Sequence, residues 1–595
     1  MRWSPAPPPS AAGHRPMPPI SGPCAAEMGG GQTDKDGPDT IRAGNRPREG
    51  LAARFVHSLH RASWRTPFHA LRLRGHQPLK LRAIPADPVP GDAAAGQAML
   101  SGTIRHGGEE ATIAGFTFAI DGRSPAFADH MQSFAWLPDL AAAGPRSKAA
   151  TPAELLLRRW LAHEGGNVGP GWRPELCGQR ILHWAAHAPL LLASGDPVHR
   201  SAMLNALARM ARHLDGTADK APAGLPRVAA CAGLVTAALL IPGREPRLAR
   251  GMAALDRALV AACWPDGGLI GRAPVDLVAL VTLLARLGAV FEAADKPVTG
   301  ELVPTLARAV PALLGVTMGD GALGSWQGGC PLPAERIAAV IEASGIRTRP
   351  LRRAREWGYQ RLVAGPVVVV ADCAPPPAAA SATGSASTLA FEMSDGPRRL
   401  IVNCGGGRPV TMLDGGLAEA LRTTAAHSTV TLDDTNSTAI LPDGTLGRGV
   451  GEVELDRRED EGGSSLEASH DGYVRRYGLA HRRRLALSAD GKALVGADIM
   501  TPAGRGPRHA AGFAVRFHLG PGVEASATAD GQGALLRLPG GGAWQFRAKG
   551  GAAVTLDASL WVNGEGRTRP TTQIVVTGEA GASGATIDWS LRRVG

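Results

Sequence analysis

The sequence contains few aromatic residues and no paired cysteines. Phe, Trp and Tyr make up 4% of the 595 residues, and three of them are tyrosines, Tyr359, Tyr473 and Tyr477. The seven cysteines occur singly, without a Cys-x-x-Cys pair, which argues against both a metal cluster and a disulfide scaffold. We therefore expect the cysteines to be small buried apolar residues.

The sequence also lacks a long hydrophobic run. The longest, Val228 to Ile241, has 14 residues, whereas a membrane-spanning helix needs about 20. The first 40 residues are rich in Pro, Gly and Ala and contain no apolar core of the kind that a secretory signal has. We therefore expect no transmembrane segment, and a disordered tail over residues 1–48.

Positive charge exceeds negative charge. Lys and Arg number 64 against 53 Asp and Glu, which gives a net charge of +11 and an isoelectric point near 9.8. This balance favours acidic partners, although it also suits a chain that is simply arginine-rich and soluble. The charge is diffuse, and no zinc finger, helix-turn-helix or RNA-binding motif accompanies it, so we expect no nucleic-acid partner.

The N-terminal part, residues 51–148, combines a helix with a short β segment. Residues 51–75 carry apolar groups at helical spacing, together with Arg and His, and predict a helix that lies either on the protein's own core or on a membrane surface. Residues 104–120 have the pattern of a short β-hairpin.

Helical periodicity dominates residues 150–350. Thr151, Pro152 and Glu154 form a capping pattern for a helix that Gly165 ends. Similar apolar patterns follow, separated by Gly and Pro. Helices of similar length joined by short loops favour a toroid or solenoid, although we find no fixed-period repeat.

After Trp357 the pattern changes to short strands rich in β-branched residues and separated by Gly, Pro, Asp and Asn. This pattern predicts a large antiparallel β-sandwich over residues 355–595. A helical domain followed by an all-β domain is the α+β multidomain class.

Five segments together resemble one family. They are WGYQRLVAGPVVVVAD at 357–372, LAFEMSDGPRRLIVNCGG at 389–406, LRTTAAHSTVTLDD at 421–434, WRPELCGQRILHWAAHAPLLL at 172–192 and WPDGGLIGRAP at 264–274. In this order they resemble the heparinase II/III family of polysaccharide lyases. The resemblance implies an N-terminal (α/α) toroid followed by a C-terminal antiparallel β-sandwich, with a substrate cleft between them.

The resemblance also implies a reaction, the β-elimination of an acidic, uronate-containing polysaccharide. A base removes the C5 proton, a cation or proton donor neutralises the neighbouring carboxylate, and an acid protonates the departing C4 oxygen. Tyr and His suit the base and acid, and Arg, His or Asn suits the carboxylate. The family implies the periplasm or cell envelope, whereas the visible N-terminus favours the cytoplasm as the alternative.

The sequence departs from the family's catalytic pattern in the helical half. The tyrosine that these lyases present ten residues after the Asp of the Asp-Gly-Gly turn, here Asp266, is replaced by Asp276. The expected Asn-His pair falls near Leu225 and Pro226. Catalytic activity is therefore in doubt.

The metal-binding positions are substituted too. The His-x-His-x-Asp pattern aligns with Thr383, Ser385 and Ser387, and an Asp that often joins a structural metal aligns with Asn403. Zinc needs three or four N, S or O ligands. We therefore expect no metal and no other cofactor.

Three residues of the β half are the main candidates for chemistry. His427 is expected either to act as acid, base or substrate ligand or to bond the backbone. Arg422 is expected either to clamp a uronate carboxylate through two donors or to form an internal salt bridge. Tyr473 is expected either to be catalytic or to belong to the core with its hydroxyl on the backbone.

The remaining candidates would bind the sugar. Trp172 and Arg173 would form an aromatic platform with a cation beside it, and the resemblance places His427 and Arg422 opposite them across the cleft. His183 and His187 share a helix face, where they either join this platform or satisfy carbonyls near Pro189.

His470 and His481 are further substrate-binding candidates. His470 lies in a His-Asp-Gly-Tyr string that is also typical of a turn. His481 precedes Arg482–Arg484, a run that is either a solvated strand face or an edge that contacts a polyanion.

Three hypotheses follow. The first is a lyase that cleaves an acidic polysaccharide. The second is a non-catalytic protein that binds acidic glycans in the same cleft, and the third is a structural or interaction protein of the cell envelope.

Overall fold

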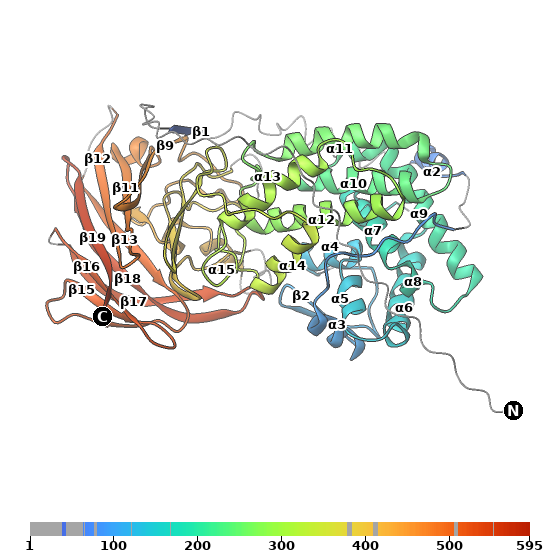
Figure 1. Ribbon diagram of the computed structural model, residues 1–595, viewed down its shortest axis with the longest axis horizontal. Helices are drawn as coiled ribbons and strands as arrows, with labels where there is room; N and C mark the ends of the chain where they lie inside the picture. The colour runs from blue at the N-terminus through green and yellow to red at the C-terminus, as the bar shows by residue number, and fades with distance from the viewer. Residues whose placement is uncertain are drawn as a thin grey trace. The chain divides into compact units, whose positions relative to one another are not determined.

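The computed structural model describes most of the chain, and it confirms the α+β architecture with a helical region followed by antiparallel sheets (Figure 1). The described residues are 39–42, 64, 66–75, 80–120, 122–166, 168–377, 383–407, 415–504, 510–550 and 552–594.

The helical region begins earlier than residue 150. Its helices are α3 (Ala93–Leu100), α4 (Pro125–Ser133), α5 (Leu137–Ala142), α6 (Arg146–Glu164), α7 (Pro174–Ala186), α8 (Ala188–Leu191), α9 (Pro197–Thr217), α10 (Leu225–Leu240), α11 (Leu248–Ala262), α12 (Pro274–Ala293), α13 (Leu302–Gly315) and α14 (Ala334–Ser344). Thr151 does not cap a helix, because α6 starts at Arg146 and Pro152 lies inside it. Gly165 ends α6 as predicted.

The apolar run Val228–Ile241 forms most of α10, which packs against α7, α9, α11 and α12. A Cβ built on Gly178 would lie 2.1 Å from the Ala229 carbonyl oxygen, and one built on Gly233 would lie 2.2 Å from the Gly178 Cα. Helices α7 and α10 therefore cross so closely that only glycine fits at these two positions.

Helix α12 is long and apolar enough to span a membrane, but 67% of its most apolar window is buried inside the protein. It packs against α10, α13 and α14. Among the described residues it is the one helix that passes this test, and its burial is that of a core helix.

The strands form a sandwich of two large sheets. In the described part, one sheet has nine strands in the order β1-β9-β10-β11-β12-β19-β16-β15-β14, and the other has the order β17-β18-β13-β7-β6-β5-β4, with β8 pairing β13. Every pairing in the two sheets is antiparallel, which confirms the predicted sandwich.

The sandwich strands are β4 (Tyr359–Ala364), β5 (Val367–Asp372), β6 (Phe391–Asp395), β7 (Arg398–Val402), β8 (Val430–Leu432), β9 (Glu452–Asp460), β10 (Gly463–His470), β11 (Leu479–Ser488), β12 (Ala493–Pro502), β13 (Ala511–Leu519), β14 (Glu524–Ala527), β15 (Gly533–Arg537), β16 (Ala543–Ala548), β17 (Ala553–Val562), β18 (Thr568–Ala580) and β19 (Ala585–Val594). A buried apolar cluster fills the space between the sheets. The predicted hairpin is also present, as β2 (Thr103–His106) and β3 (Glu109–Thr112).

The predicted tail and N-terminal helix lie mostly outside the described residues. Within the tail, Asp39–Arg42 form strand β1, which pairs with β9 and buries Ile41, so disorder is wrong for these four residues. Within the predicted helix 51–75, Pro67–Arg72 form α2.

The six cysteines in the described residues are free and buried, as expected of small apolar side chains.

Candidate functional site

His427 lies at the entrance of β8, where the sequence places it, but its side chain is enclosed. A 3₁₀ turn, Thr424–Ala426, brings His427 back so that its Nδ1 lies 2.7 Å from the Thr423 carbonyl oxygen. The residue is 1% exposed. Burial lowers its pKa to about 4, so the ring is neutral at pH 7 and donates from Nδ1 to the carbonyl.

Arg422 is buried and binds backbone carbonyls. Its Nε donates to the Gly384 carbonyl oxygen at 2.8 Å, and its Nη2 donates to that of Gly444 at 2.7 Å. Neither predicted role, a substrate clamp or an internal salt bridge, matches these contacts. The guanidinium joins two loops of the sandwich.

Tyr473 belongs to the sandwich core. It is 1% exposed, and its hydroxyl donates to the Val430 carbonyl oxygen at 2.7 Å. Burial raises the pKa of the phenol well above its usual range. A catalytic role needs access to substrate, so the catalytic prediction for Tyr473 is wrong and the core alternative holds.

His470 and His481 point into the sandwich. The Gly472 amide donates to His470 Nδ1 at 3.1 Å, His470 Nε2 lies 3.3 Å from His481 Nδ1, and His481 Nε2 lies 2.8 Å from Asp498 Oδ1. Two neutral rings satisfy this chain, each donating from Nε2. Both residues are buried, so the predicted contact of His470 and His481 with substrate is wrong.

Asp498 is the centre of this network. Arg483 donates to both of its carboxylate oxygens, at 2.8 and 3.0 Å, and Trp589 Nε1 donates to Oδ2 at 2.9 Å. Although burial alone would raise the pKa of Asp498, Arg483 and His481 hold it well below its usual range. The arrangement is a saturated buried ion pair.

Trp172 cannot serve as a sugar platform, because it is fully buried in the helical domain. Its Nε1 donates to the Glu164 carbonyl oxygen at 2.9 Å, and its ring packs against Trp160 and His213. The neighbouring Arg173 is partly exposed and forms an ion pair with Asp129. The platform prediction is therefore wrong for Trp172, and the Arg173 cation is already paired.

His183 and His187 are held by internal partners. His183 Nδ1 lies 2.8 Å from the Ser133 carbonyl oxygen, and its Nε2 accepts from Arg286 at 2.9 Å. Burial lowers the pKa of His183 to about 3. His187 Nε2 lies 3.3 Å from Asp87 Oδ2, so these histidines fix the helical domain rather than present donors to a sugar.

The two pairs that were expected to line the cleft each bond groups of their own domain. Arg422 and His427 bond loops of the sandwich, whereas Trp172 and Arg173 bond groups of the helical domain. That these two pairs face each other across a cleft remains a prediction.

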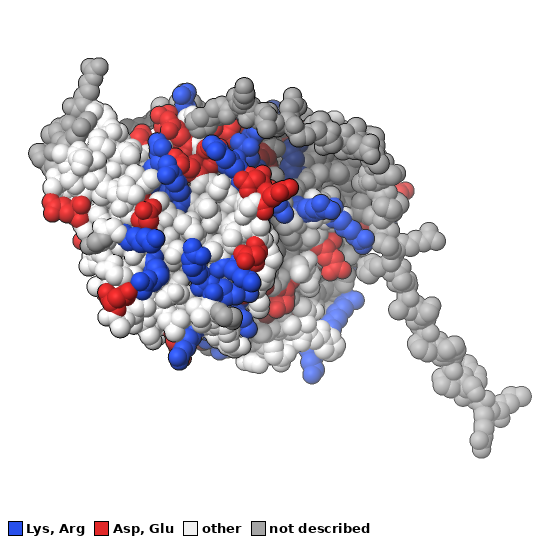
Figure 2. All heavy atoms as spheres, turned by 60° about the vertical axis from the view of Figure 1, so that its left-hand side comes forward, with Lys and Arg blue, Asp and Glu red and all other residues white. Residues whose placement is uncertain are grey.

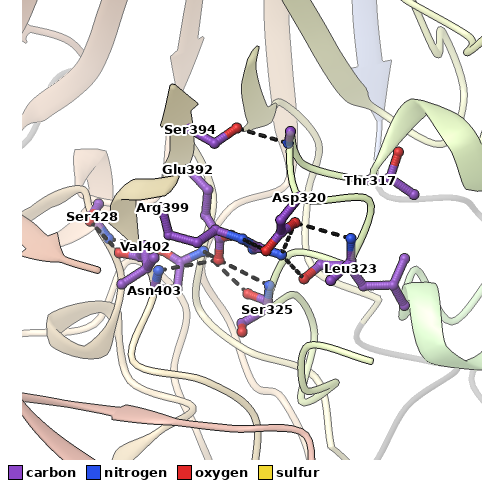
Figure 3. Close-up of polar contacts among 12 residues, drawn as sticks. Thr317, Asp320, Leu323, Ser325, Glu392, Ser394, Arg399, Val402, Asn403 and Ser428 are labelled. Carbon is purple, nitrogen blue, oxygen red and sulfur yellow. Dashed lines mark hydrogen bonds and ion pairs between the residues drawn. The ribbon is translucent and has the colours of Figure 1, made fainter. Parts of the chain in front are cut away.

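A polar junction that the sequence did not predict joins the two domains. Figure 3 shows Arg399 of β7 between Asp320 of the helical half and Glu392 of β6. Arg399 Nε and Nη2 bond the Asp320 carboxylate at 2.8 and 2.9 Å, and Nη1 bonds Glu392 Oε2 at 3.2 Å. Arg399 lies in the family-like segment 389–406, but nothing in the sequence indicated its partner Asp320, which only the fold brings beside it.

A second ion pair crosses the same boundary. Arg272 Nη2 lies 2.6 Å from Asp372 Oδ1, and both side chains are buried. Asp372 Oδ2 also accepts hydrogen bonds from Ser387 Oγ at 2.7 Å and from the side-chain amide nitrogen Nε2 of Gln327 at 3.2 Å. The carboxylate is therefore fully used inside the protein.

The positions that align with family metal ligands do not fit a metal. Asn403 Nδ2 donates to Glu392 Oε1 at 3.2 Å, while Asn403 Oδ1 accepts from the Ser428 amide at 3.0 Å. Ser387 gives its proton to Asp372. A metal ion needs several free oxygen or nitrogen acceptors. Here the Asn403 amide and the Arg399 guanidinium both donate to the Glu392 carboxylate, so its oxygens are already occupied. The expected absence of a metal remains a prediction.

A helical toroid followed by this sandwich is the architecture of polysaccharide-lyase-like proteins. A family model described as heparinase II/III-like, C-terminal, matches residues 346–590. The chain is also 33% identical over 504 residues to the FtsZ-localized protein C of Caulobacter vibrioides, an alignment that covers 80% of this chain and 84% of that protein. The chain therefore belongs to the heparinase II/III-like family.

Solved structures agree in fold. Heparinase III superimposes with a TM-score of 0.65 at 14% identity, covering 93% of each chain. The heparan sulfate lyase HepC from Pedobacter heparinus superimposes with a TM-score of 0.55 at 14% identity, covering 91% of this chain and 88% of its own.

Proposed function

We propose that this chain is a non-catalytic member of the family that acts by binding a protein partner at FtsZ-containing assemblies. The observation that carries the proposal is that the tyrosine hydroxyls are bonded inside the protein. The hydroxyls of Tyr359, Tyr473 and Tyr477 donate to the carbonyl oxygens of Arg272, Val430 and Leu432, so every tyrosine of the chain is committed to the protein interior.

The histidine candidates support the same conclusion. A general base must reach the proton that it removes, at hydrogen-bond distance or through one water molecule. His427, His470 and His481 are 1%, 3% and 0% exposed, and each bonds another group of the protein. The β-elimination that the resemblance implied therefore has no accessible base among the candidate residues.

The surface charge does not favour a polyanion on the outer face of the sandwich. Figure 2 shows Lys and Arg interspersed with Asp and Glu, with uncharged surface between them. On β11, Arg482 and Arg484 both pair with Glu467 of β10, and on β9 Arg458 pairs with Asp456. Glu467 offsets one of the two arginines and Asp456 offsets Arg458, so these residues leave a single net positive charge for a sulfated or uronate chain.

The choice of FtsZ as the associated assembly comes from the Caulobacter vibrioides relative, which is named as an FtsZ-localized protein. A protein that accompanies FtsZ shares its compartment, so the proposal places this chain in the cytoplasm rather than the periplasm. Paired fusions to a reporter that is active only in the cytoplasm and one that is active only in the periplasm would test this.

Two assays separate the proposal from a lyase. The purified chain is incubated with heparan sulfate, hyaluronan, alginate and polyglucuronate, and the ultraviolet absorbance of the unsaturated uronate product is followed, with an active lyase as positive control. We expect no product. In parallel, the chain is sedimented with FtsZ polymers, and we expect it in the pellet only when FtsZ is assembled.

Turnover that exceeds the no-enzyme rate and is lost in His427→Ala would restore the lyase hypothesis. An absence of both turnover and co-sedimentation would contradict the binding proposal.

A further inference from the structure

A groove lies at the β14 edge of the nine-stranded sheet. It has a volume of about 570 Å³. It is lined by residues 538–542, which connect β15 to β16, and by Gly522, Glu524, Arg537, Ala543 and Val594. This volume falls in the range of ligand-binding pockets, about 300–1,000 Å³. The groove therefore has room for a short stretch of extended chain.

The glycine turn shapes one wall of the groove. Gly540, Gly541 and Gly542 have φ values of 76°, 105° and 91°, a conformation that other residues adopt only with strain. A Cβ built on Gly541 would meet nothing within 4 Å. No side chain therefore covers the groove at Gly541, although the Gly541 amide itself donates to the Leu538 carbonyl oxygen at 3.1 Å.

One arginine lines the groove, and a second lies against the glycine turn that forms its wall. Arg537 is exposed and forms no ion pair within the described residues. A Cβ built on Gly542 would lie 3.7 Å from Arg398 Nη1, and Arg398 Nη2 donates to the Gly540 carbonyl oxygen at 3.3 Å. Glu524 lies opposite Arg537 in the β14–β15 register and also lines the groove, while the Arg398 guanidinium adds a positive charge beside the turn.

The remaining lining favours a peptide over a sugar or a base. Leu538, Pro539 and Val594 are apolar, and Val594 is 45% exposed. No aromatic residue lines the groove, so it has no platform on which a sugar ring or nucleobase would stack. Apolar contacts beside guanidinium groups match a segment that alternates apolar and acidic side chains.

We propose that this groove binds an acidic peptide segment, with Arg537 as the principal carboxylate ligand. Assigning that segment to the FtsZ-containing assembly rests on the proposed function, whereas the binding chemistry does not.

The test uses the full chain and a fluorescent octapeptide of alternating Glu and Leu, followed by anisotropy, with the Gln-Leu peptide as its neutral match. We expect the acidic peptide to bind about tenfold more tightly than the neutral one, an advantage that falls as salt is raised. Arg537→Gln should remove most of this advantage, and Arg537→Glu should abolish binding.

A control and a second variant guard against loss of fold. Arg569→Gln removes an exposed arginine of β18 and should leave binding unchanged. Val594→Asp keeps both arginines, places a negative charge in the groove at an exposed position, and should weaken binding. Thermal unfolding confirms that each variant is folded.

Equal affinity for the two peptides would contradict the proposal that the groove binds an acidic peptide. Equal effects of Arg537→Gln and Arg569→Gln on binding would contradict it as well. Displacement of the peptide by inorganic phosphate at the same concentration would replace the peptide with a phosphate group as the ligand and also overturn the proposal. If the peptide fails to bind while the wild-type chain still sediments with FtsZ, the groove assignment falls and the proposed function stands.

Discussion

Buried neutral histidines should make this fold less stable as the pH falls below about 6.5. Burial lowers the pKa of His427 to about 4 and those of His183 and His518 to about 3. In the unfolded chain each titrates near its ordinary value of about 6.5. Below that pH the histidines bind protons in the unfolded state but remain neutral in the folded state. The free energy of unfolding therefore falls as the pH drops from about 6.5 towards about 4.

The magnitude is large enough to measure. With these pKa values, lowering the pH from 7.5 to 5 costs about 2 kcal/mol per histidine, or about 6 kcal/mol for the three. Asp139 opposes this change, because burial raises its pKa to about 6. Its protonation in the folded state stabilises the fold by about 1.4 kcal/mol over the same pH range. The remaining loss of about 4 to 5 kcal/mol compares with a typical total stability of about 5–15 kcal/mol.

Urea unfolding, followed by tryptophan fluorescence at pH 7.5 and 5.0, measures the loss. His518→Gln removes one titrating ring that bonds Ser559 and the Ala425 carbonyl, and should reduce the pH-dependent loss by about 2 kcal/mol. His163→Gln, at a side chain 45% exposed, is the matched control and should leave the loss unchanged. Equal losses in both variants would refute the reasoning.

Three further substitutions should act on stability. Arg272→Met leaves the buried Asp372 carboxylate without its cation and should cost about 3–5 kcal/mol in urea unfolding; a cost below about 1 kcal/mol would contradict the buried pair. Tyr473→Phe removes one hydrogen bond and should cost about 1 kcal/mol while leaving FtsZ co-sedimentation intact; loss of sedimentation in a folded variant would assign Tyr473 a functional role. Gly233→Ala places a Cβ 2.2 Å from the Gly178 Cα and should lower the melting temperature sharply, an effect that an unchanged melting curve would disprove.

The fold class could be read from the sequence because hydrophobic periodicity records it directly. The change of period near Trp357 marks the first sandwich strand, β4, within two residues. Boundaries were less accurate where a local signal competed with packing. The capping pattern at Thr151 was outweighed by the continuous helix from Arg146, in which Pro152 is accommodated near the N-terminal end.

The candidate site could not be read in the same way, because a polar residue in a strand has two possible faces. In β11 the residues from Leu479 to Leu487 alternate, so His481 and Arg483 point inward while Arg482 and Arg484 point outward. The Arg-rich string itself does not distinguish these faces. The inward pair is acceptable only because Asp498 of β12 lies beside it, and that partner is set by strand register.

Partners within the fold also explain the polar junction at Arg399. A buried carboxylate costs several kcal/mol unless a cation or hydrogen bonds satisfy it. Here Arg399 supplies the cation for Glu392, and Asn403 supplies a donor. Because both groups come from the chain itself, the buried Glu392 carboxylate has its cation and its donors within the fold. Arg399 also bonds Asp320, so the same guanidinium ties the sandwich to the helical half.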